Sequence, residues 1–282
     1  MSISGKVDPV VRRITIADIA EAFGQGLRDF QAAPLYGLAF GAFYAVGGLL
    51  ILACLTAFHM VYLAYPLAAG FALIGPFVAL GLYEVSRQRE AGTRPSWLQI
   101  IGLMRSRSEL GWMAFVTLFL FVIWMYQVRL LIALFLGVGA SFGSLQEFIS
   151  AVLTTNEGLV FLAVGNCVGA GLALVLFSLT AVSFPLLLDR DVDFVTAMVT
   201  SVRAVVASPL PMIGWAATIV LLLVVSALPY LLGLVVTLPV LGHATWHLYR
   251  KIVAPVEAEL PVAEDADATS NIVVMPKRAV AS

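Results

Sequence analysis

Long stretches without a charged residue constrain this chain more than any other feature of its sequence. Lys, Arg, Asp and Glu are absent from residues 35–60, 61–83, 159–188 and 204–249, and residues 112–137 contain only Arg129. A helix needs about 20 apolar residues to cross roughly 30 Å of hydrocarbon. Each run is therefore long enough to span a membrane.

The longest run, 204–249, is too long for one span and divides at 229–233, where proline and glycine favour a turn. The runs 35–60 and 61–83 are contiguous, so they predict an antiparallel hairpin. Backbone groups in lipid need internal partners, which favours helices. We predict an all-α integral membrane bundle of six transmembrane helices in three hairpins.

Composition excludes several classes of protein. Hydrophobic residues make up 61% of the 282 residues and charged residues 12%, whereas a soluble domain has about 25% charged residues. A soluble enzyme, a disordered protein and a nucleic-acid-binding protein are therefore excluded. Cys54 and Cys167 lie in apolar runs without a CxxC motif, so no disulfide framework or zinc finger is indicated.

The basic residues predict the orientation. Six spans place every Lys and Arg except Arg129 on one side, and positive residues stay on the cytoplasmic side. We therefore expect a multi-pass membrane protein with both termini in the cytoplasm and no signal peptide. Three parts follow: a cytoplasmic segment at 1–34, a six-span domain at 35–252, and a disordered cytoplasmic tail at 253–282.

Short amphipathic helices are predicted outside the spans. Apolar residues recur every three or four positions in 15–31, 96–106 and 192–206, which are all on the cytoplasmic side. Gly92 is expected to break the chain before the second of these helices. The loop 138–158 is expected to form a short helix on the outer surface.

Two polar residues within the spans are candidates for function. Arg129 is predicted in the outer third of the third span, where it could extend towards water, pair with Glu147 or Glu157, or contact a solute. Asn166, in the fourth span beside several glycines, could form a hydrogen bond across a helix contact.

His243 and His247 are four residues apart and so share one face of the sixth helix. Two such residues can bind a metal, and Glu84 and Asp189 at other helix ends could complete the site. The alternative is hydrogen bonding at the membrane interface, which we favour. We therefore predict no catalytic residue, metal or cofactor, and keep these four side chains as metal candidates.

Several motifs resemble those of a known family: Arg12-Arg13-Ile14, Gly81-Leu82-Tyr83-Glu84-Val85-Ser86-Arg87, Leu187-Leu188-Asp189-Arg190 and Gly242-His243-Ala244-Thr245-Trp246-His247. Over about residues 12–252 the chain resembles a proteobacterial family of multi-span membrane proteins classed as a domain of unknown function. This resemblance implies a location in the bacterial inner membrane and no established activity. Some members are labelled cytochrome c oxidase subunits. An oxidase core needs several intramembrane His ligands, and this chain has 3 His in total, so we reject that activity.

We expect a non-enzymatic accessory or assembly module that contacts membrane lipids and other membrane proteins, or a second copy of itself. The sparse ionisable groups and the small-residue helix faces favour this function. The alternative is a small-solute transporter or channel, which the prolines of the later helices and Arg129 would favour. A water-filled cavity lined by Arg129 and Asn166 would select the alternative.

Overall fold

The described part of the chain is helical and contains no β-strand, which confirms the all-α class. The computed structural model describes residues 8–58, 67, 71, 73–106, 108–138 and 145–255. The predicted turn near His59 and residues 256–282 of the predicted tail lie outside these ranges.

Four helical stretches in the described residues are long and apolar enough to cross a membrane. They are α2 (Pro34–Ala57), α6 (Glu109–Phe135), the stretch Asn156–Asp189, and α11 (Pro209–Ala227). They correspond to the first, third, fourth and fifth predicted spans. The stretch Asn156–Asp189 comprises α8 (Asn156–Thr180) and α9 (Ser183–Asp189).

The second and sixth predicted spans are not among these four. Part of the second lies outside the described residues, and its described helix, α4 (Gly75–Glu90), has 16 residues. The sixth corresponds to α12 (Leu234–Ile252), whose second half is polar and buried. The expected division at 229–233 is confirmed, since α11 ends at Ala227 and α12 begins at Leu234.

The amphipathic helices form close to their predicted positions. They are α1 (Ile16–Ala32), α5 (Trp97–Ser106), α10 (Phe194–Ala207) and, in the expected outer loop, α7 (Leu145–Thr154). Thr15 and Asp18 cap α1 reciprocally, and Asp193 caps α10. Gly92 has a φ of 70°, which a glycine adopts without strain, so the chain turns there after α4.

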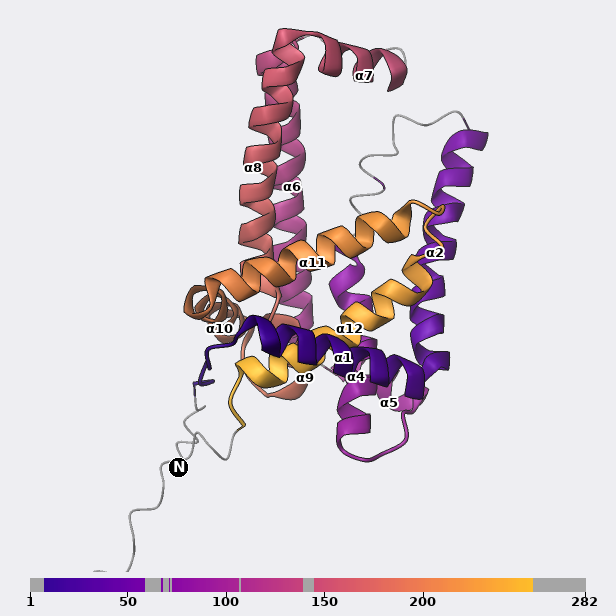
Figure 1. Ribbon diagram of the computed structural model, residues 1–282, viewed down its shortest axis with the longest axis vertical. Coiled ribbons are helices and arrows are strands. Elements are labelled where there is room, and N and C mark those ends of the chain that lie inside the picture. Colours follow the sequence, from indigo (N-terminus) through magenta and orange to yellow (C-terminus); the bar gives the residue numbers. More distant parts are fainter. Residues whose placement is uncertain are drawn as a thin grey trace, which may run out of the picture.

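The helices separate into a packed end and a splayed end (Figure 1). Helices α6 and α8 lie side by side and rise away from the rest, with α7 across their far end, while α2 rises separately. Helices α1, α4, α5, α9 and α10 gather at the opposite end with the second half of α12. We call this group of helices the base, and it contains most of the buried core.

Helix α12 is the centre of the packing, because it contacts α1, α2, α4, α9 and α11. Two glycines allow the close approach. A Cβ at Gly26 would lie 2.5 Å from the backbone nitrogen of Ala244, and a Cβ at Gly41 would contact the carbonyl oxygen of Val235. Glycine at positions 26 and 41 therefore lets α1 and α2 pack closely against α12.

The two ends of the described chain meet beneath the base. Val11 and Val253 form an isolated antiparallel bridge, in which Arg12 N donates to Ile252 O and Ala254 N to Val10 O. Val253 and Ala254, the first residues of the predicted tail, are buried and hydrogen-bonded rather than disordered. The two segments are over 200 residues apart in sequence, so the local sequence of neither segment predicts that they pair.

Candidate functional site

Asp29 lies at the centre of a buried polar cluster in the base. Its Oδ1 accepts a hydrogen bond from Arg89 Nε at 3.0 Å, and its Oδ2 accepts one from Ser86 Oγ at 2.7 Å. His247 Nε2 also donates to Oδ2 at 2.7 Å. One carboxylate of α1 therefore joins α4 to α12. We call Asp29, Ser86, Arg89, His243 and His247 the Asp29 cluster.

His243 extends this cluster by one hydrogen bond. The single proton of Ser86 Oγ goes to Asp29, so His243 Nδ1 must donate to Ser86 Oγ, at 2.8 Å. His243 Nε2 then carries a lone pair, and this atom has no hydrogen-bond partner among the described residues. The side chain is fully buried at 0% exposure, so the lone pair is not offered to solvent.

Hydrogen bonds give Asp29 a pKa far below the usual value for aspartate. Burial alone would raise this pKa. Hydrogen bonds from His247, Ser86 and Arg89 outweigh the effect of burial and lower the pKa from 3.8 to about 2. Asp29 is therefore an anion at any physiological pH.

Two further carboxylates of the base, Glu84 and Glu90, are also paired. Glu84 accepts hydrogen bonds from Arg87 at 2.7 Å and from Gln88 at 2.6 Å. Glu90 accepts one from Trp246 Nε1 at 3.0 Å and pairs with Arg250. Each of these contacts joins two side chains of the same protein and stabilises the base.

The structure distributes the four metal candidates over three separate contacts. His243 and His247 bind within the Asp29 cluster, Glu84 pairs with Arg87, and Asp189 accepts a hydrogen bond from Tyr249 Oη at 2.7 Å and pairs with Arg250. The described residues contain no group of three His, Cys, Asp or Glu side chains placed to hold a metal ion.

Sequence reasoning identified the two histidines but not Asp29 or Ser86, which hold them. Asp29 falls on the polar face of an amphipathic helix, where an acidic residue predicts solvent exposure. Its partners Ser86 and His247 are 57 and 218 residues away. The family motifs around Ser86 and around the two histidines are the signals in the sequence that could have pointed to the cluster.

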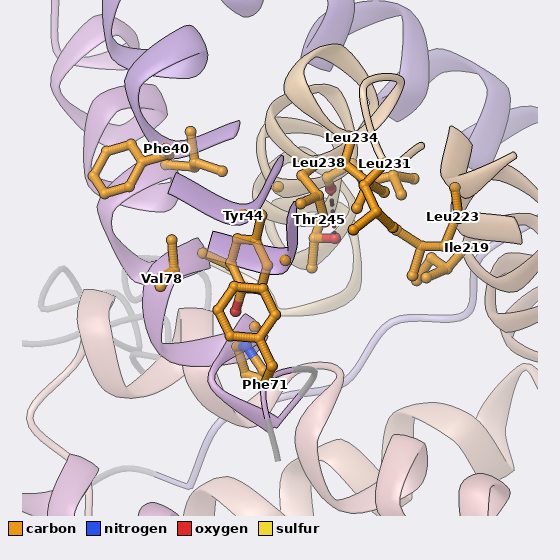
Figure 2. A pocket seen from close by; sticks show the side chains of 18 of the residues that line it. Phe40, Tyr44, Phe71, Val78, Ile219, Leu223, Leu231, Leu234, Leu238 and Thr245 are labelled. Carbon is orange, nitrogen blue, oxygen red and sulfur yellow. Dashed lines mark hydrogen bonds between the residues drawn. The ribbon is translucent and has the colours of Figure 1, made fainter. Parts of the chain in front are cut away.

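An apolar cavity of about 800 Å³ lies among α2, α4, α11 and α12. Figure 2 shows Tyr44 and Phe71 in its middle, Phe40 and Val78 on one side, and leucines of α11 and α12 on the other. None of the described residues that line it is charged. Tyr44 Oη is buried there and has no hydrogen-bond partner among the described residues.

Arg129 and Asn166 lie away from this cavity. Arg129 is exposed on α6 and does not line the cavity. Asn166 is exposed on α8 and donates to Leu162 O of its own helix at 2.8 Å. The structure therefore does not bring these two residues together at a site.

Part of the chain matches a known protein family. No curated protein and no solved structure matches it. Residues 64–189 match a family described as "Predicted integral membrane protein (DUF2189)", a domain of unknown function. The matched segment runs from before α4 to the end of α9 and includes Ser86 and Arg89, whereas Asp29 and the two histidines lie outside it. Residues 64–189 therefore carry the sequence pattern of DUF2189, an integral membrane protein family.

Proposed function

We propose that the protein is a non-enzymatic accessory or assembly module of the bacterial inner membrane, which binds apolar helices of other membrane proteins through the hairpin of α6 and α8. The observation that carries this proposal is the exposure of the hairpin. The most apolar 18 consecutive residues of each helix show this exposure. The rest of the chain buries 6% of these residues in α6 and 0% in the stretch Asn156–Asp189 that contains α8, whereas it buries 22% of them in α2.

The surface of α8 suits helix association. A Cβ added at Gly169 would meet no atom within 4 Å, and the same holds at Gly171 on the opposite side of the helix. The helix face at Gly169 therefore has no partner among the described residues. Small residues let a second helix approach closely in lipid, where van der Waals packing drives association. Bilayer lipid is the competing occupant of this face.

The proposed topology has six passes with both termini in the cytoplasm. It takes residues 61–83 and α12 as the two spans beyond the four apolar stretches. The ion pairs of the base support this, because they collect Arg87, Arg89, Arg250 and Lys251 at one end of the molecule, as the positive-inside rule requires of a cytoplasmic face.

Two further observations favour an accessory role over the alternatives. Transport of a polar solute needs polar groups along its path, yet the lining of the described cavity contains no charged residue, nor Arg129 or Asn166. The ionisable groups of the Asp29 cluster are bound to one another, and the free Nε2 of His243 is sealed from solvent. This favours a structural role for the cluster over catalysis.

Site-specific photocrosslinking in native membranes tests the proposal. A photoreactive side chain at Gly169 should give a discrete adduct with one membrane protein, identified by mass spectrometry, and the added change Gly165→Leu on the same hairpin should abolish it. The matched control is the same photoreactive side chain at Val220, which is 60% exposed on α11 and should give no such adduct. Adducts with lipid alone at Gly169 would contradict the proposal.

A further inference from the structure

The apolar cavity has the properties of a binding site for a small lipid. Its volume of about 800 Å³ lies within the 300–1,000 Å³ of typical ligand pockets. We propose that it binds a lipid with a planar ring that carries a carbonyl group and an apolar tail, which is the chemistry of an isoprenoid quinone. This inference does not depend on the accessory role.

Aromatic residues make the lining suited to a planar ring. Tyr44 and Phe71 face each other with ring centroids 4.8 Å apart and an interplanar angle of 51° (Figure 2). Trp215, Phe177 and Phe184 also line the cavity. Aromatic side chains favour offset or tilted contacts with another ring, while the leucines around them suit a hydrocarbon tail.

Tyr44 supplies a buried polar group in the cavity lining that lacks a hydrogen-bond partner among the described residues. Its side chain is 7% exposed, and the atom without a partner is Oη. A buried hydroxyl without a hydrogen bond is costly. A ligand that offers an acceptor, such as a ring carbonyl, would satisfy this hydroxyl.

The depth of Tyr44 selects the kind of lipid. At 1.5 Å per residue, α2 is about 36 Å long and Tyr44 lies about 15 Å along it from Pro34, near the middle of a hydrocarbon layer of roughly 30 Å. The ester carbonyls of phospholipids lie at the polar border of the bilayer, too far away to accept from Tyr44. A quinone ring, which has no charged headgroup, can reach the middle.

Photolabelling of the full chain in nanodiscs tests the proposal. An isoprenoid quinone that carries a photoreactive azide should label peptides of α2, α4 and α12, and unlabelled quinone should compete. Val78→Trp, which fills the cavity, should lower the labelling at least tenfold, whereas Val220→Trp on the exposed face of α11 should leave it unchanged. Tyr44→Phe should weaken the affinity of the unlabelled quinone, measured by competition, about fivefold, whereas Tyr126→Phe should not change it.

A second probe distinguishes a specific site from bulk lipid. If phosphatidylethanolamine with a diazirine in its acyl chain labels the cavity peptides and the quinone does not, the proposal is overturned. Quinone labelling that does not saturate, or that persists in Val78→Trp, overturns it as well. Leu223→Trp blocks the cavity from α11 and serves in place of Val78→Trp if that variant does not fold.

Discussion

Asp29 carries a negative charge where most water is excluded, and three side chains from two other helices stabilise it. Its side chain is 11% exposed, and both oxygens accept short hydrogen bonds. A buried charge is tolerated when its partners satisfy it, and removal of one partner leaves the others unpaired. The cluster therefore stabilises the base as a complete set of partners, and the loss of one member destabilises the others.

Asp29→Ala should lower the free energy of unfolding by about 2–4 kcal/mol, because it leaves Arg89, Ser86 and His247 in the base without their acceptor. Denaturation by SDS in mixed micelles measures this change. Asp191→Ala is the matched control, since Asp191 is exposed, and it should change stability by less than about 0.5 kcal/mol. Equal effects of the two variants would contradict the role of the cluster.

The low pKa of Asp29 makes the stability of the base depend on pH. The folded pKa, about 2, lies below the usual 3.8, so the stabilisation is fully present above pH 4 and is lost as pH falls towards 2. The loss should be about 1–2 kcal/mol, after allowance for partial solvent screening. Unfolding of the wild type and of Asp29→Asn between pH 5 and 2 checks this, and an identical slope in both would refute it.

Helices that repeat apolar residues every three or four positions could be predicted closely from the sequence. The predicted range 15–31 became α1 at Ile16–Ala32, and 192–206 became α10 at Phe194–Ala207, because local periodicity and caps determine such helices. The burial of α12 could not be predicted in this way. Its run of apolar residues resembles a lipid-facing span, whereas contacts with α1, α4 and α9 bury its polar half.

Gly41→Ala should separate α2 from α12, because the new Cβ would contact the carbonyl oxygen of Val235, a backbone atom that cannot move aside. We expect a loss of about 1–3 kcal/mol, typical of overpacking. Gly169→Ala is the matched control in α8, where a Cβ meets nothing within 4 Å and alanine favours the helix. Thermal unfolding in detergent, followed by circular dichroism, compares them, and no destabilisation by Gly41→Ala would contradict this packing.

The whole molecule combines a polar, closely packed base with apolar helices that diverge from it (Figure 1). The separation follows the charge distribution, because charged side chains are buried only where they have oppositely charged or hydrogen-bonding partners. The apolar helices, in contrast, need only lipid or another helix to cover them. Sequence reasoning could predict this division from charge alone. It could not predict the cavity, whose lining combines residues of α2, α4, α11 and α12 that no sequence pattern relates.

The most direct test of six passes with a cytoplasmic base is a set of reporter fusions at the turns. Green fluorescent protein fused after residue 92 or residue 254 should fluoresce, and alkaline phosphatase fused after residue 60 or residue 232 should be active, because these sites alternate between cytoplasm and periplasm. Active phosphatase after residue 92 would show that residues 61–83 do not cross the membrane and would contradict the account.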